Sequence, residues 1–341
     1  MKSGLKLLAL NLALWLVLEL VAFAVLSSQR STDGDRSGGD RSDRDRSDKS
    51  WLTQARLSFE GGLYVWDPHC LWTLQPGYVS DVNPGRKFWG EGPLRVNDLG
   101  MRGPSHAKVR PDGIKRILIL GGSHPMGMYV NYEETYGARL QASLGDGWEV
   151  LNAAAPGHTS FQTAQYLAHY GTAFSPDIVI ADVGVNDALP LTPDFPQPDH
   201  LVKRPPRWAK DARSALRHSN VYRLLRQWLT RAEELPPSEF AVRVPPGLRQ
   251  QNLAAMRALG TEHGFTVVVI NQFRADLHGS GHIQCLSEDA DLEPRVDACD
   301  LWRGLGDVRG WFADPVHANS QGHALLAGRI LARLRALQLV P

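Results

Sequence analysis

The sequence has little that would support metal binding or attraction to nucleic acid. It contains three cysteines, and no Cys/His spacing in it resembles a zinc site. Its 37 basic and 36 acidic side chains leave a net charge of +1, which gives no electrostatic case for a nucleic-acid partner. The sequence therefore predicts no metal, no other cofactor and no nucleic-acid binding.

Cysteine is too sparse to define a disulfide framework. Outside the cytoplasm, Cys285 and Cys299 are close enough in sequence to pair across a short loop. The alternative is three free thiols, including Cys70, and the sequence alone leaves both alternatives open.

Residues 27–50 lack any apolar side chain that could build a core. The tract is rich in Ser, Gly, Asp and Arg, and its charges nearly cancel. Such a composition predicts a disordered, solvated linker between two other parts of the chain.

A long apolar run precedes this linker. Residues 7–26 are interrupted only by Asn11 and Glu19, and twenty residues in a helix span about 30 Å, the thickness of the hydrocarbon layer. This run therefore predicts that residues 1–26 form a transmembrane anchor, with a cleavable signal sequence as the alternative. The run exceeds the usual length of a signal-sequence core, which favours the anchor. Either interpretation places the rest of the chain outside the cytoplasm, periplasmic or extracellular, and secreted if the N-terminus is cleaved.

Residues 51–341 predict one folded domain with two departures from a regular pattern. Residues 51–110 are rich in Trp, Gly and Pro and predict an N-terminal extension of short extended pieces joined by turns. Residues 188–245 predict a helical insertion, with a proline-rich loop before a helix at 212–234. We interpret that helix as a surface helix, and a lid over a site is the alternative.

Strands and helices alternate through the remainder of the domain. This alternation predicts an α/β fold in which a central parallel sheet is flanked by helices. Expected strands are 117–120, 149–152, 177–183 and 265–270, and expected helices are 132–144, one capped by Thr159 and Gln162, 248–263, and one capped near Asn319 and ending near Leu337.

Ser123 follows the first of these strands. Gly121 and Gly122 precede it and allow a tight turn at the carboxyl end of the strand, where open α/β sheets place their ligands. We interpret Ser123 as a nucleophile. Considered alone, this stretch is better explained as an ordinary strand-to-helix turn with Ser123 as the helix N-cap.

A base and an orienting acid lie near the C-terminus. Asp314 and His317 are three residues apart in a turn before the last helix, so the carboxylate is able to reach the imidazole Nδ1. Acyl transfer also needs donors for an oxyanion, and Gly157 and Asn186 follow two other strands. Taken singly, each of these residues is also typical of a turn.

Together, these blocks resemble the SGNH, or GDSL-type, hydrolase superfamily, and its exported bacterial members in particular. The resemblance covers about residues 116–337. It rests on Gly121-Gly122-Ser123, Gly157, Gly184-Val185-Asn186-Asp187 and Asp314-Pro315-Val316-His317. Upstream, Asn97-Asp98-Leu99-Gly100-Met101-Arg102-Gly103 is similar to a stretch that precedes the domain in exported members, with Met101 in place of an aromatic residue.

The resemblance implies a flavodoxin-like three-layer α/β/α fold and ester hydrolysis or acyl transfer without a metal. It implies that Ser123 is the nucleophile, His317 the base and Asp314 its orienter. The Ser123 backbone, Gly157 and Asn186 would form the oxyanion hole. The sequence departs from the family at Gly122, where aspartate is usual, which bears on loop support and substrate preference.

Two further residues are predicted to contact substrate, namely His124 and Asp187. The predicted function is a membrane-tethered exported serine esterase that removes small acyl groups, acetyl in particular, from carbohydrate. The alternatives are an O-acyltransferase that modifies an exported polysaccharide and a non-catalytic binding module. The sequence does not decide the acyl length, the alcohol or the oligomeric state.

Overall fold

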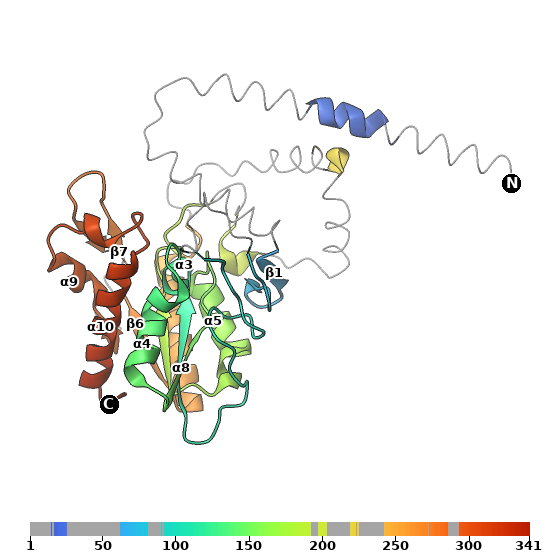
Figure 1. Cartoon of the computed structure of the whole chain (residues 1–341). Helices are drawn as coiled ribbons and strands as arrows, with labels where there is room; N and C mark the ends of the chain where they lie inside the picture. The colour runs from blue at the N-terminus through green and yellow to red at the C-terminus, as the bar shows by residue number, and fades with distance from the viewer. Residues whose placement is uncertain are drawn as a thin grey trace. The chain divides into compact units, whose positions relative to one another are not determined.

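The structure is a computed structural model (Figure 1). The residues it describes are 15, 17–25, 62–80, 90, 92–191, 197–202, 219–222, 224, 242–271, 273–285 and 293–341. The linker at 27–50 and most of the predicted helix at 212–234 lie outside them. The chain divides into one compact unit of residues 1–53 and 203–239 and another of residues 54–202 and 240–341. Residues 17–25 are helical, and none of the helices in the described residues is long and apolar enough to span a membrane.

The second unit contains a five-stranded parallel sheet. Its strand order is β4-β3-β5-β6-β9. The strands are β3 (Lys115–Gly121), β4 (Trp148–Asn152), β5 (Ile178–Asp182), β6 (Thr266–Ile270) and β9 (Arg295–Val296). Counted along the chain this order is 2-1-3-4-5, the doubly wound order of flavodoxin-like folds. The order reverses at β3, so ligands are expected at the carboxyl end of that strand.

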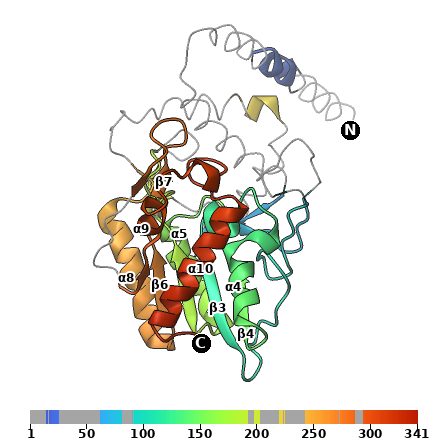
Figure 2. The same ribbon diagram turned by 60° about the vertical axis from the view of Figure 1, so that its left-hand side comes forward.

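Helices cover both faces of the sheet. On one face lie α4 (Tyr136–Leu144) and α10 (Ser320–Ala336), and on the other α5 (Ser160–His169) and α8 (Pro246–His263), as Figure 2 shows. Alternate residues of β3 face opposite layers, so that Ile117 and Ile119 pack under α4 and α10, whereas Leu118 and Leu120 pack under α5 and α8. The predicted α/β fold with a central parallel sheet is confirmed.

The capping residues set the helix ends. Thr159 and Gln162 form the predicted capping box of α5, and Asn319 accepts the Gly322 N–H at the start of α10. The expected helix at 132–144 is interrupted. A short 3-10 helix, η2 (Tyr132–Glu134), ends at Thr135, whose extended backbone starts α4 and whose hydroxyl accepts the Ala138 N–H.

The remaining elements are short. They are β1 (Tyr64–Asp67), β2 (Leu71–Leu74), α3 (Ser123–Met126), η3 (Gly171–Phe174), η4 (Asp199–Leu201), β7 (Phe273–Ala275), β8 (Ile283–Cys285), α9 (Ala298–Arg303) and η5 (Arg309–Trp311). β1 and β2 form an antiparallel hairpin, as do β7 and β8. Both hairpins and β9 are too short for a hydrophobic period to reveal them in the sequence.

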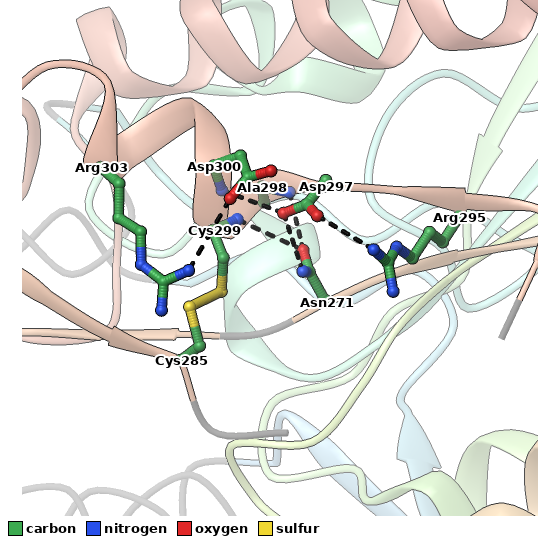
Figure 3. The surroundings of a disulfide bond; sticks show 8 residues. All are labelled: Asn271, Cys285, Arg295, Asp297, Ala298, Cys299, Asp300 and Arg303. Atoms are coloured by element: carbon green, nitrogen blue, oxygen red, sulfur yellow. Dashed lines mark hydrogen bonds and ion pairs between the residues drawn. A yellow bond between two sulfur atoms is a disulfide. The ribbon is translucent and has the colours of Figure 1, made fainter. Parts of the chain in front are cut away.

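The disulfide question that the sequence left open has an answer in the structure. Cys285 of β8 is bonded to Cys299 of α9, as Figure 3 shows, while Cys70 is a free, buried thiol. Beside the bond, the Asn271 carboxamide oxygen accepts the Ala298 N–H at 2.7 Å and so holds the start of α9. The bond attaches the β7–β8 hairpin to the helical layer.

The hairpin of the N-terminal extension packs over the carboxyl edge of the sheet. Leu63, Tyr64, Leu71, Trp72 and Leu74 share a buried cluster with residues that follow β3 and β4, namely Met126, Ala154 and Ala155. The extension therefore contacts the loops in which the predicted site residues lie.

Candidate active site

Ser123 begins α3 directly after β3. The turn between them depends on Gly121, which has φ +145° and where a Cβ atom would lie 2.1 Å from the Asp182 carbonyl oxygen. Only glycine fits so close to β5, and the turn places the serine at the edge of the sheet.

The structure brings three of the predicted residues into contact. Ser123 Oγ lies 2.7 Å from His317 Nε2, and His317 Nδ1 lies 2.7 Å from Asp314 Oδ2. Asp314 Oδ1 also accepts the backbone N–H groups of Val316 and His317, each at 2.8 Å. With Nδ1–H donating to the carboxylate, Nε2 is left to accept the serine proton. This is the geometry that a serine nucleophile, its base and an orienting acid would require.

Asp314 is held in its ionised form. Burial raises the pKa of this carboxyl, but the charge and hydrogen bond of His317 and the backbone donors outweigh that effect and lower the pKa to about 2. The carboxylate therefore stays negative at every pH at which His317 would act as a base.

Tyr129 is a site residue that sequence reasoning missed. Its ring lies edge-on to the His317 imidazole, with centroids 5.4 Å apart, and its hydroxyl hydrogen-bonds Asp314. Burial, followed by the charge and hydrogen bond of Asp314, raises the pKa of Tyr129. Its φ is +71°, an outlier for a bulky side chain of the kind that clusters at functional sites. No local pattern in the sequence signals such a backbone conformation.

Asn186 lies against the turn that carries the nucleophile. Its Nδ2 donates to the His158 carbonyl at 2.9 Å, which leaves its second amide hydrogen for another acceptor. A Cβ atom at Gly122 would lie only 2.5 Å from that Nδ2. The glycine at the position where the family usually has aspartate thus makes room for the amide next to Ser123.

Gly157 occupies the loop beside Asn186. Its φ is +81°, which favours glycine, and no hydrogen bond from its N–H to another described residue is found. His158, the next residue, is buried. Burial lowers its pKa to about 4, so the imidazole is neutral at physiological pH and its Nε2–H donates to the Trp72 carbonyl at 2.8 Å. Together with Asn186, the loop presents unpaired N–H donors of the type an oxyanion hole requires.

The structure places His124 in the core, which corrects the expectation that it contacts substrate. It is 5% exposed, and its Nδ1 lies 2.8 Å from Asp182 Oδ2, which also accepts the Tyr136 hydroxyl. Successive residues of a helix are about 100° apart, so when Ser123 faces His317 the next residue, His124, faces the interior. The contact between His124 and Asp182 therefore joins α3 to β5 in the core.

Asp187 is also buried, contrary to the same expectation. Its Oδ1 accepts the Ser160 N–H at 2.7 Å, and its Oδ2 lies 3.4 Å from Arg249 Nε. Burial raises the pKa of Asp187 to about 6, against the opposing effects of these partners. The Asp187 carboxylate therefore holds the first turn of α5 from within the core.

Arg102, from the upstream block, holds the loop after α3. The residue is 4% exposed, and its guanidinium donates to the backbone carbonyls of Met126, Gly127 and Val130. These carbonyls flank Tyr129, so the arginine supports the unusual backbone there. Within the described ranges, no group of three or more His, Cys, Asp or Glu side chains is arranged to hold a metal ion.

Comparisons with known proteins identify the family of this chain. Residues 119–325 match the model of the GDSL-like Lipase/Acylhydrolase family, whereas a comparison with curated proteins finds no match. Among solved structures, TesA is 19% identical, with 65% of this chain and 99% of that chain covered and a TM-score of 0.42. LAE5, an α/β hydrolase enzyme from the metagenome of Lake Arreo, Spain, is 15% identical (64% and 94% covered, TM-score 0.41). The acetyl xylan esterase AlAXEase is 13% identical (64% and 98% covered, TM-score 0.39). These structural likenesses are too distant to carry an argument. The family match covers more than half of the chain, and this protein therefore belongs to the GDSL-like lipase/acylhydrolase family.

Proposed function

We propose that this protein is an exported, membrane-tethered serine esterase that hydrolyses small acyl esters through an acyl-enzyme. The observation that carries the proposal is the 2.7 Å contact between Ser123 Oγ and His317 Nε2, with the Asp314 carboxylate at Nδ1. Membership of a lipase/acylhydrolase family supports ester bonds as the target.

The geometry supports a two-step reaction. Ser123 Oγ bonds to the ester carbonyl carbon while its proton passes to His317 Nε2, and the carbonyl oxygen becomes an oxyanion. The N–H groups of Ser123 and Gly157 and the Asn186 amide stabilise that charge. The bond to the alcohol then breaks, and His317 returns the proton to the leaving oxygen. Water repeats the sequence on the acyl-enzyme, releases the acid and restores Ser123.

The proposed location and substrate rest on other features. The apolar run at 7–26 supports a membrane tether, and the Cys285–Cys299 bond supports an oxidising compartment, where disulfides persist. The resemblance to exported members supports acetylated carbohydrate as the substrate class. O-acyl transfer to a polysaccharide stays the alternative predicted from the sequence.

The nucleophile is tested by Ser123→Ala in the full chain. We expect hydrolysis of p-nitrophenyl acetate to fall by about 10³-fold or more, because residues of a catalytic triad act as a unit. The matched control is Ser143→Ala, a serine on the exposed surface of α4, which should keep full activity. Equal turnover by the two variants would remove Ser123 from the mechanism.

The substrate is tested by comparing acyl groups and acceptors. We expect p-nitrophenyl acetate to be hydrolysed faster than the octanoate ester and acetate to be released from an acetylated oligosaccharide. Acetyl transfer to added polysaccharide, in place of release to water, would support the acyltransferase alternative. A preference for the octanoate would contradict the small-acyl proposal.

A further inference from the structure

The Pro156–Gly157 peptide group carries one of the proposed oxyanion donors. The Gly157 N–H and the Pro156 carbonyl belong to the same planar unit, and in a trans peptide they point in opposite directions. Whatever holds the carbonyl therefore sets the direction of the N–H. The partners of this carbonyl come from the N-terminal hairpin and not from the residues matched by the family model.

Trp72 and Tyr64 are those partners. The indole Nε1–H of Trp72 donates to the Pro156 oxygen at 3.2 Å, and the Tyr64 hydroxyl lies 3.5 Å from the same oxygen. The two side chains are 4% and 8% exposed, and their rings meet edge-on with centroids 6.3 Å apart. Both donors are consequently fixed by packing, in surroundings from which most water is excluded.

The other side of Gly157 is fixed as well. The Gly157 carbonyl accepts Arg243 Nη1 at 2.8 Å, and Arg243 forms a buried ion pair with Asp199. The arginine also lies over the Trp72 ring, 5.6 Å from its centroid. With both neighbouring carbonyls held, the peptide has little freedom to rotate and so to redirect its N–H.

A hydrogen bond to a peptide carbonyl also polarises the peptide. Hydrogen bonds in a chain strengthen one another, and the effect is larger where the local dielectric constant is low. A donor on the Pro156 oxygen should therefore make the Gly157 N–H a stronger donor as well as a better-aimed one. Oxyanion stabilisation depends on both properties, because the donor must be in place before charge develops.

We propose that Trp72, assisted by Tyr64, is a positioning residue of the oxyanion hole. It holds and polarises the peptide whose N–H receives the oxyanion, so the hairpin of the N-terminal extension completes the catalytic site. This inference rests on the proposed esterase function. It adds two residues, one on each strand of the β1–β2 hairpin, to a site whose other members lie at 122–317.

The test is Trp72→Phe in the full chain, which removes the N–H and keeps a large ring. We expect kcat for p-nitrophenyl acetate to fall about 10-fold, the effect of roughly one neutral hydrogen bond, with KM unchanged. The inhibition constant of a trifluoromethyl ketone, which forms an oxyanion on Ser123, should rise by the same factor. The ¹⁵N and ¹H shifts of the Gly157 amide should also move, because its peptide loses a carbonyl partner.

Tyr64→Phe provides a second variant, which deletes a single hydroxyl and should change the same quantities in the same direction by a smaller factor. The matched control is Trp66→Phe on the same hairpin, where the side chain is 51% exposed, and it should leave kcat, KM and the inhibition constant unchanged. An unchanged kcat in Trp72→Phe, or a rise in KM alone, would overturn the proposal.

The wild-type and Ser123→Ala proteins separate this result from failure of the proposed function. If the wild type hydrolyses the ester and Ser123→Ala does not, the esterase function stands whatever Trp72→Phe does. If Trp72→Phe does not fold, Tyr64→Phe decides, because unchanged kinetics and an unmoved Gly157 amide in that variant also overturn the proposal.

Discussion

Gly122 occupies the position where related sequences usually carry aspartate, and the structure offers a steric reason for the glycine. Its φ of −91° lies outside the left-handed region that favours glycine. The constraint is space, since a Cβ atom would lie 2.5 Å from Asn186 Nδ2 and 3.4 Å from the His158 oxygen. A single carbon added at Gly122 would therefore collide with the Asn186 amide, a proposed oxyanion donor.

At this residue we predict the effect of Gly122→Ala. The methyl group should displace the Asn186 amide and lower kcat by about 10- to 100-fold, up to the loss caused by removing an oxyanion donor. Thermal stability should change little, because the partly buried Asn186 amide is able to move. Gly147→Ala is the control, because a Cβ atom there meets nothing within 4 Å. Turnover equal to that of the control would show that the amide does not need this space.

At the scale of elements, the loop after α3 depends on the upstream extension. Arg102 donates to the carbonyls of Met126, Gly127 and Val130, and Asn152 Nδ2 donates to the Pro125 carbonyl at 2.8 Å. Burial lowers the pKa of Arg102 to about 10, so the side chain remains charged at neutral pH. One planar cation thus satisfies three buried carbonyls and keeps Tyr129 against the loop that carries Asp314 and His317.

For this element we predict that Arg102→Lys is not conservative. A lysine ammonium is a compact charge on a flexible stem and cannot reproduce the planar fork, so at least one buried carbonyl should lose its donor. We expect a loss of about 1–3 kcal/mol in unfolding free energy, measured by urea denaturation, together with a lower kcat. Arg335→Lys, on the exposed side of α10, is the control. Equal stability and activity in Arg102→Lys and Arg335→Lys would show that the loop after α3 does not need the guanidinium.

At the scale of the whole molecule, buried titratable groups determine how stability depends on pH. Burial lowers the pKa of His158 to about 4 and holds that of His323 well below its usual value. Both groups are neutral in the native state and take up protons on unfolding below about pH 6.5. Their contribution to stability is complete above that pH and is lost as the pH falls through 6.5 toward 4. Asp187, whose pKa is raised to about 6, has the opposite sign, because its contribution is lost as the pH rises through 6.

We therefore predict that the unfolding free energy falls when the pH is lowered from about 7.5 to 5.5. Each histidine adds a slope of up to about 1.4 kcal/mol per pH unit, and Asp187 partly offsets the fall below pH 6. His158→Gln keeps a donor near the Trp72 carbonyl but does not titrate. The unfolding free energy of this variant should therefore depend less steeply on pH, by the uptake of up to one proton. Urea denaturation at several pH values measures this difference. Identical slopes for the variant and the wild type would contradict the assignment.

The sequence by itself determined the features that local patterns encode. Apolar runs located four of the five parallel strands, and caps such as Thr159 and Asn319 located helix starts. The carboxyl ends of parallel strands share one edge, so residues that follow those strands were expected to lie close together. In the structure Ser123 lies within hydrogen-bond distance of His317, which precedes α10 and is 194 positions away.

Only the tertiary structure decided which side chains face that edge and what holds them there. His124 and Asp187 follow site residues in sequence but turn inward, because consecutive residues of a turn or helix point in different directions. Trp72 and Tyr129 carry no sequence signal, since their positions come from packing of a short hairpin and from a loop held by a distant arginine. Periodicity and capping are local, whereas contact between such distant segments depends on how the layers pack.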